Sequence, residues 1–411
     1  MSGESFRFIH AGDFHLDRPL GDFDDYPATI AESLAMAPRN AAAAVFDAAA
    51  AENIDFLVLT GDLLSPAEAG PHGMSLLIDG FEKLAAANTA VFWVAGVTDD
   101  PAHWPQSIPL PGNVHLFDKQ SVQNIPVQRA GRTICRLVGR STDRRTALSI
   151  AGYGDHAGAD EYTIGVGYGT ATESLLREAD LDYWSLGGKT QRHRFEELGR
   201  GNGGYCGTPQ SRGFDQSGPH GYTVVDVDAD QTCRVHTVDC DAVRYRTVDI
   251  NAGDIASVGN LKNLLGSELA RVAADGGGRH QMVRFELRCD DGASLTSIGD
   301  LETLLASLRR DHGGGNPATW VADIRMTGPA DYPTSWRDED TILGDFLREA
   351  KETKADPSRF PVLAAFTEEQ SLPTSVANQL AEVPSSRQNE ILDQATMLGV
   401  HLLRGGPLPT S

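Results

Sequence analysis

The sequence has few cysteines, and they are scattered along the chain. The five are Cys135, Cys206, Cys233, Cys240 and Cys289, and no two of them form a Cys-x-x-Cys pair. An odd number without such a pair argues against a disulfide framework and against a thiolate zinc site. We therefore interpret the cysteines as small core residues or free thiols.

Long apolar runs are also absent. No stretch approaches the ~18 apolar residues that a transmembrane helix requires, and the alanine-rich segment 41–51 is interrupted by Asp47. Residues 1–10 contain no apolar core of the kind found in signal peptides. From these absences we expect a cytoplasmic protein with no membrane partner.

Basic residues are scarce relative to acidic ones. The 411 residues include 35 Lys+Arg and 57 Asp+Glu, which gives a formal net charge of −22. Proteins that bind nucleic acid by neutralising phosphates present a basic face, whereas this net charge repels a polyanion at long range. Contact with nucleic acid would therefore need a local basic patch or a partner's surface. The acidic composition also fits ordinary solubility.

The first half of the chain alternates apolar strands with helical patterns. Strands are expected at 7–11, 55–60 and 90–95, with helices at 37–51 and 74–87 between them. This alternation predicts right-handed crossovers and a largely parallel sheet, which binds ligands at the carboxyl ends of its strands. Further strands are expected at 133–138, 162–167, 182–186 and 221–228.

The pattern changes near Thr247. From there we expect a small α+β unit that ends at about residue 328, then a linker over 328–333, and a helical pattern beyond Asp338. The sequence thus predicts an α/β domain followed by two smaller parts. The expected boundaries are 1–245, 246–328 and 329–411.

Metal-ligating residue types follow two of the expected strands. Asp13 and His15 come after the first strand, and Asp62 comes after the second. Residues two apart on an extended chain share a face, and carboxylate and imidazole groups suit divalent cations. Together the three residues predict a metal site at the carboxyl edge of the sheet, although an Asp-x-His pair alone is also common at ordinary surfaces.

Three segments resemble the calcineurin-like metallophosphoesterases, and among these the DNA-repair exonucleases of the SbcD and YhaO type. They are residues 10–17 (HAGDFHLD), 55–64 (DFLVLTGDLL) and 205–221 (YCGTPQSRGFDQSGPHG). The resemblance covers about residues 6–228. It implies a four-layer α/β/β/α sandwich, followed by a small α+β capping domain and a helical C-terminal segment. It also implies a two-metal nuclease site, in which the ions clamp the attacking and leaving oxygens.

Part of the family's metal-binding set is retained. By the resemblance, Asp13, His15 and Asp62 are metal ligands, and Asp62 is the one shared by both ions. The family's Gly-Asn-His-Asp motif corresponds to residues 96–99 (GVTD), so that its last residue is retained as Asp99.

The other ligand positions of the family are replaced. Val97 stands where the family has an Asn ligand, and Thr98 where it has the histidine that helps to protonate the leaving group. Tyr168 replaces an isolated His ligand, while Gly188 and Thr190 replace both histidines of a Gly-His-x-His motif. Loss of a general acid alone typically costs roughly 10²–10⁴ in rate. We therefore expect at most one divalent cation, Mn²⁺ or Mg²⁺, with no cation at all as the alternative.

Three functions remain compatible with these residues. In the first, which we favour, the fold serves as a catalytically impaired or inactive scaffold subunit of a DNA-repair complex. In the second, the three retained ligands form a one-metal phosphodiesterase or nuclease site with a substitute fourth ligand, for which His193 is nearest and His103 and His156 are further options. The third is a different chemistry in the same crevice.

The most basic run of the chain lies where two histidine ligands are lost. Lys189, Arg192 and Arg194 could hold a phosphate there without a metal, since arginine binds it bidentately and lysine as a point charge. The alternative is a solvated loop. A weaker basic group is formed by Arg140, Arg144 and Arg145.

The glycine-rich residues 201–204 (GNGG) do not form a phosphate-binding loop. They lack the Gly-Lys-Ser/Thr ending of such a loop, and no helix pattern follows them. We expect a flexible loop.

The resemblance also implies partners. In the family the capping domain contacts DNA, and helices near the C-terminus bind the coiled-coil base of an SMC-like ATPase. We therefore expect an SMC-like ATPase partner and DNA contact through the complex, with a homodimer as a further option. Ile342, Leu343, Phe346 and Leu347 suit a helix lying in a partner's groove, and they suit packing within the chain equally well.

Overall fold

The computed structural model divides into two compact units. It describes residues 4–405 apart from positions 19, 21–25, 52, 143, 145, 157–160, 200, 253–254, 256, 289–300, 328–331 and 357–384. The first unit comprises Met1–Tyr245 with Gly278–His280, and the second comprises Arg246–Gly277 with Gln281–Ser411. The predicted linker at 328–333 lies largely outside the described residues.

The first sheet of the first unit has six strands in the order β12-β11-β1-β2-β3-β4. Strands β1 to β4 pair in parallel, whereas β11 pairs antiparallel to both β1 and β12. The predicted parallel sheet is thus confirmed for β1–β4. The strands are β1 (Phe6–Ala11), β2 (Phe56–Thr60), β3 (Ala90–Val94), β4 (Val114–Leu116), β11 (Gly221–Val227) and β12 (Cys233–Asp239).

The second sheet also has six strands, in the order β5-β6-β7-β8-β10-β9. They are β5 (Gln123–Arg129), β6 (Arg132–Gly139), β7 (Thr163–Tyr168), β8 (Tyr183–Gly187), β9 (His193–Leu198) and β10 (Gly201–Tyr205).

The expectation of a flexible loop at residues 201–204 is wrong, because these residues form β10, a largely buried strand beside β8. The glycines are needed for close packing: a Cβ on Gly203 would lie 2.4 Å from the carbonyl oxygen of Trp184.

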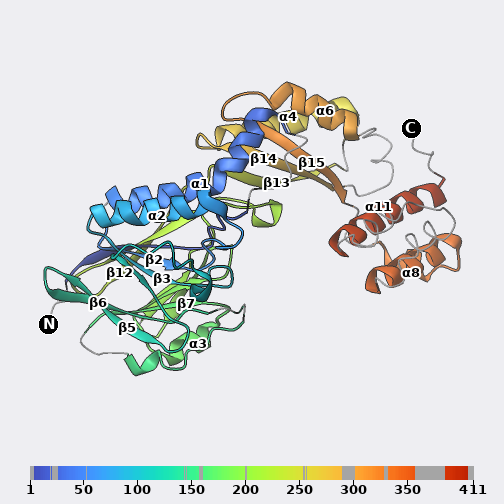
Figure 1. Cartoon of the computed structure of the whole chain (residues 1–411). Helices are drawn as coiled ribbons and strands as arrows, with labels where there is room; N and C mark the ends of the chain where they lie inside the picture. Colours follow the sequence, from blue (N-terminus) through green and yellow to red (C-terminus); the bar gives the residue numbers. More distant parts are fainter. Residues whose placement is uncertain are drawn as a thin grey trace. The chain divides into compact units, whose positions relative to one another are not determined.

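The two sheets pack face to face and carry helices on their outer faces (Figure 1). Phe8 and Phe56 of the first sheet share one buried apolar cluster with Ile164 and Tyr183 of the second. Helices α1 (Ala28–Ala51) and α2 (Gly70–Ala86) cover the other face of the first sheet, and α3 (Glu173–Glu178) packs on the second. The predicted four-layer α/β/β/α sandwich is confirmed. Helix α1 begins at Ala28 rather than near residue 37 and continues through Pro38.

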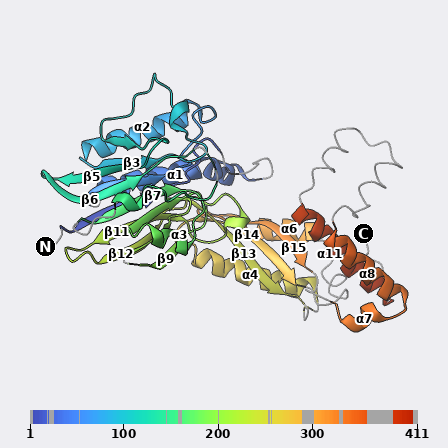
Figure 2. The same ribbon diagram turned by 90° about the horizontal axis from the view of Figure 1, so that it is seen from below.

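The second unit contains a three-stranded sheet in the order β13-β14-β15. Helices α4 and α6 pack on this sheet through an apolar core (Figure 2). The sheet and its helices are β13 (Val243–Asn251), α4 (Val258–Ala274), β14 (His280–Arg288), α6 (Leu301–His312) and β15 (Thr319–Thr327). The expected domain boundary at residue 328 stays a prediction.

The chain continues in helices α7 (Thr334–Asp338), α8 (Ile342–Ala355) and α11 (Ser385–Leu403). Helices α8 and α11 lie side by side (Figures 1 and 2). Phe346 packs so closely on α11 that a Cβ on Gly399 would lie 2.3 Å from its ring, and Leu347 is buried. Packing within the chain therefore explains the apolar side chains of Phe346 and Leu347. Ile342, in contrast, is 75 % exposed. Among the described residues, no helix is both long and apolar enough to cross a membrane.

Candidate metal centre

Asp13, His15 and Asp62 meet at the carboxyl ends of two neighbouring parallel strands. Asp13 and His15 follow β1, and Asp62 follows β2. Two backbone hydrogen bonds join the loops that carry them: the amide of Asp13 donates to the carbonyl of Gly61 at 2.8 Å, and the amide of His15 donates to the carbonyl of Asp62 at 3.0 Å. The sheet register thus brings the three side chains to one place.

All three residues adopt a left-handed backbone conformation. The φ angles are 54° at Asp13, 46° at His15 and 53° at Asp62. A left-handed conformation costs a non-glycine residue roughly 1–2 kcal/mol, and such strain is concentrated at functional sites, where the surrounding structure holds it. Here the turns direct two carboxylates and one imidazole into the same buried space.

The geometry of this group fits a divalent cation. One ligand atom from each of Asp13, His15 and Asp62 lies within 4.8 Å of the others. The three residues are buried, with exposed fractions of 1 %, 7 % and 0 %, and buried carboxylates need a compensating partner. Burial lowers the pKa of His15 and so favours the neutral imidazole, the form that binds a metal. The His15 Nδ1 atom has no hydrogen-bond partner among the described residues.

Asp13 is held by two segments that are distant in sequence. The amide of Gly188, which follows β8, donates to its Oδ2 at 3.3 Å, and the Thr208 hydroxyl donates to its carbonyl oxygen at 2.8 Å. Thr208 belongs to the segment 205–221 that carries the family resemblance. Gly188 therefore contributes a backbone donor at a position where the family has a histidine ligand.

Asp62 accepts hydrogen bonds at both carboxylate oxygens. The backbone amide and hydroxyl of Thr98 donate to Oδ1 at 3.0 and 3.2 Å, and the phenol hydroxyl of Tyr168 donates to Oδ2 at 2.5 Å. By the resemblance, Thr98 and Tyr168 stand where the family has histidines. Each donates a hydrogen bond to the Asp62 carboxylate.

The ring of Tyr168 fills the space beside Asp62. It is packed against glycine backbones: a Cβ would lie 2.7 Å from the ring at Gly61, 2.5 Å at Gly96 and 3.1 Å at Gly188. Val97 has a side chain without a lone pair and is 37 % exposed. Among the described residues, no second group of three or more His, Cys, Asp or Glu residues has metal-binding geometry.

Asp99 supports the turn that carries Asp62 and is not part of the three-residue group. Its two oxygens accept four hydrogen bonds, three from backbone amides, at Asp62 (3.0 Å), Leu63 (3.2 Å) and Gly96 (2.7 Å), and one from the Trp93 indole (3.0 Å). Burial and then the nearby Asp62 raise the pKa of Asp99 to about 7. Asp99 is therefore a positioning residue.

The basic run points away from the carboxylates. The Lys189 ammonium lies 4.4 Å from the centre of the Tyr205 ring, and Arg192 pairs with Asp239 at 3.3 Å. The carbonyl of Thr190 accepts a hydrogen bond from the amide of Thr208 at 3.0 Å.

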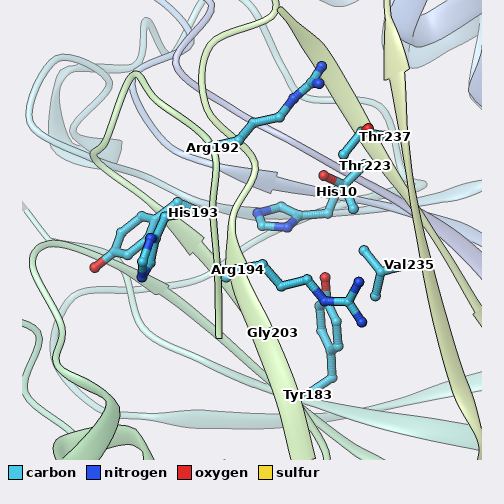
Figure 3. Close-up of a pocket in the computed structure, with 11 residues that line it drawn as sticks. His10, Tyr183, Arg192, His193, Arg194, Gly203, Thr223, Val235 and Thr237 are labelled. Atoms are coloured by element: carbon cyan, nitrogen blue, oxygen red, sulfur yellow. The ribbon is translucent and has the colours of Figure 1, made fainter. Parts of the chain in front are cut away.

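His193 and Arg194 line a separate pocket of about 360 Å³ (Figure 3). The His193 ring lies edge-on to Phe195, with centroids 4.6 Å apart. Arg194 extends toward Tyr183, whereas Arg192 extends away from them (Figure 3). The metal-binding group includes neither His193 nor the two other histidines proposed as substitutes, His103 and His156.

Arg140 and Arg144 line another pocket, to which Tyr168 also contributes. Arg145, the last member of the predicted weaker basic group, lies outside the described residues.

Comparison with known proteins agrees with this geometry. Residues 6–188 match the family model of the calcineurin-like phosphoesterases. The uncharacterized metallophosphoesterase YhaO of Bacillus subtilis is 28 % identical over 245 residues, which cover 54 % of this chain and 57 % of that protein. The chain thus matches little more than half the length of this relative.

A solved structure was also found, that of a dimetal phosphatase from Danio rerio. It is 10 % identical with a TM-score of 0.34, and the match covers 54 % of this chain and 92 % of that one. The match over residues 6–188 and the layered sheets are consistent with the calcineurin-like phosphoesterase fold.

Proposed function

We propose that this domain binds a single divalent cation through Asp13, His15 and Asp62 and serves as a catalytically impaired or inactive subunit of a DNA-repair complex. The observation that carries the proposal is the hydrogen bond from Tyr168 to Oδ2 of Asp62. It engages one of the two oxygens that a bridging carboxylate would offer, and the tyrosine ring fills the neighbouring space.

The remaining residues support the loss of two-metal hydrolysis. When bound, a divalent cation supplies a Lewis acid for a phosphoryl oxygen, and a second cation would stabilise the opposite oxygen of the displacement. Thr98 stands in the place of the general acid, and its hydroxyl is engaged with Asp62. A threonine hydroxyl does not titrate near neutral pH and so cannot replace a histidine as the proton donor.

The partner assignment rests on the resemblance to the repair exonucleases. An SMC-like ATPase is the proposed partner, and DNA would be reached through the complex. Helix α8 offers the exposed Ile342 for such a contact, since Phe346 and Leu347 are engaged within the chain. A homodimer remains an alternative assembly.

The second candidate is a one-metal phosphodiesterase or nuclease. It is favoured by the convergence of Asp13, His15 and Asp62 within 4.8 Å in a buried site. In that case the three residues would hold the cation, and Thr98 and Tyr168 would orient the carboxylate of Asp62.

One experiment separates the two candidates. Manganese binding is measured by titration calorimetry on the wild type, on Asp62→Asn and on Asp47→Asn, an exposed aspartate that serves as the matched control. Nuclease and phosphodiesterase assays are run on the same samples. We expect one ion per chain in the wild type and the control, none in Asp62→Asn, and no cleavage above the Asp62→Asn background. Cleavage that is lost in Asp62→Asn would favour the second candidate, and two ions per chain would overturn the single-cation proposal.

A further inference from the structure

A second pocket opens beside the metal centre and is lined by basic and hydroxyl side chains. Its volume is about 350 Å³, and its lining includes Lys119, Arg140, Ser141, Thr142, Arg144 and Tyr168. We call it the arginine pocket. None of its lining residues belongs to the metal-binding group, and the proposed function makes no use of its charges.

The arginine pocket lies at the same edge of the sandwich as the metal centre. Lys119 follows the end of β4, Arg140 follows the end of β6, and Tyr168 is the last residue of β7. The carboxyl ends of parallel strands are where α/β sheets bind ligands. Tyr168 contributes to both the arginine pocket and the candidate metal centre, because it lines the pocket and its hydroxyl contacts Asp62.

Hydrogen bonds fix the loop that carries the two arginines. The backbone amide of Ser141 donates to Asp118 at 2.8 Å, and that of Thr142 donates to Ala95 at 3.1 Å. The Ser141 hydroxyl donates to Phe117 at 2.5 Å, and the Thr142 hydroxyl accepts from the amide of Arg144 at 3.2 Å. Ser141 and Thr142 are thus attached to the segments that follow β3 and β4.

The charge of this pocket contrasts with that of the whole chain. Arg140, Arg144 and Lys119 gather on one pocket of a protein whose formal net charge is −22. Lys119 also lies 2.7 Å from Asp100, which offsets its charge. Arg140 and Arg144 also line the pocket, and guanidinium groups are suited to bidentate binding of phosphate.

We propose that the arginine pocket binds a terminal phosphomonoester, carried by a nucleic-acid strand end or by a free nucleotide. A terminal phosphate bears up to two negative charges, which two arginines can match. A pocket suits an end group, whereas an internal backbone phosphate would need an open groove that lets the strand pass. The binding requires no metal, so it does not depend on the proposed cation site.

The test is a binding measurement with the full chain in EDTA. The probes are a fluorescent oligonucleotide with a 5′-phosphate, the same oligonucleotide with a 5′-hydroxyl, and thymidine 5′-monophosphate as competitor. The variants are Arg140→Gln and Arg144→Gln. Arg132→Gln, at the opposite end of β6, where the side chain is 80 % exposed, is the matched control.

We expect the phosphorylated strand to bind the wild type about 10-fold or more tightly than the hydroxyl strand. Each pocket variant should lose most of this preference, whereas Arg132→Gln should keep it. Arg140→Lys, which retains the charge but not the fork, should give an intermediate value. Competition by thymidine monophosphate would identify a free nucleotide as a sufficient ligand, and its failure would identify the strand end.

Equal affinity for the two strands in the wild type, or an unchanged preference in both Arg140→Gln and Arg144→Gln, would overturn the proposal. Asp62→Asn separates it from the cation proposal. This variant should lose manganese binding and keep the phosphate preference, so either property can fail without the other.

Discussion

The hydroxyl of Tyr168 lies 2.5 Å from Oδ2 of Asp62, although 106 positions separate the two residues. Tyr168 ends β7 of the second sheet, and Asp62 follows β2 of the first. The bond therefore joins the two sheets at the metal centre. A side chain of the second sheet thus contacts a carboxylate of the candidate metal centre.

Removing this hydroxyl should separate its effect on folding from its effect on metal binding. Tyr168→Phe keeps the ring but leaves Oδ2 of Asp62 without its donor, and a hydrogen bond to a charged group contributes about 1.5–3 kcal/mol. We expect the free energy of unfolding without metal to fall by about that amount, and manganese to restore more stability to the variant than to the wild type. Urea unfolding with and without manganese measures both quantities. If manganese raises the free energy of unfolding equally in the wild type and in Tyr168→Phe, this role of Tyr168 is contradicted.

A second cation should bind once the space beside Asp62 is reopened. Val97→Asn together with Tyr168→His replaces a side chain without a lone pair and the ring that fills the space. We expect calorimetry to give two ions per chain for this double variant, with the second bound more weakly. Val97→Asn alone is the control and should still bind one ion, because the Tyr168 ring remains. One ion in both variants would show that the ring does not block the second site.

Asp99 should affect metal binding without touching the metal. Asp99→Asn places an amide among four donors that now meet carboxylate oxygens, so at least one buried amide loses its acceptor. An unsatisfied buried donor costs about 1–3 kcal/mol. We expect lower stability and weaker manganese binding, because the Asp62 turn shifts.

Asp100→Asn is the matched control for this change. Its carboxylate pairs with Lys119 at 2.7 Å and accepts a hydrogen bond from the backbone amide of Ala102 at 2.9 Å. Both variants are compared by calorimetry and urea unfolding. If Asp99→Asn binds manganese as tightly as the control, Asp99 does not position Asp62.

Buried His10 should make the protein less stable in mild acid. Burial lowers its pKa to about 3, so the folded state keeps it neutral, while the unfolded chain protonates it below about pH 6.5. The contribution of neutral His10 to the free energy of unfolding is therefore fully present above pH 6.5 and is lost as the pH falls toward 3. Linkage limits the loss to about 2 kcal/mol between pH 7 and pH 5.

The measurement is urea unfolding at these two pH values. His10→Gln should reduce the difference between them, whereas His236→Gln, at a half-exposed position on β12, should not. An unchanged pH dependence in His10→Gln would assign the acid sensitivity to other groups.

The sequence predicted the strands that bury apolar runs and missed those that depend on close packing. Residues 56–60 (FLVLT) form a nearly continuous apolar run, which predicts a buried strand such as β2. Residues 201–205 of β10 contain three glycines, and nothing in the segment itself indicates that Trp184 packs against them. That contact is set by the neighbouring strand.

The candidate site also contains residues that the sequence predicted and one whose role it did not. Asp13, His15 and Asp62 could be chosen from the sequence because each follows a predicted strand and carries a ligand atom. The role of Tyr168 could not, because comparison with a histidine motif indicates only that a ligand is lost. That its hydroxyl reaches Asp62 depends on how the second sheet packs on the first.

The contacts of Asp13 also determine when the site can form during synthesis. Its carbonyl accepts from Thr208, 195 positions later, and β1 pairs with β11 at residues 221–227. Closing so long a loop is entropically costly and slow, so such contacts form late in folding. A nascent chain that has emerged only to residue 188 holds Asp13, His15 and Asp62 but lacks these contacts. The metal centre is therefore completed only after the β11 segment has left the ribosome.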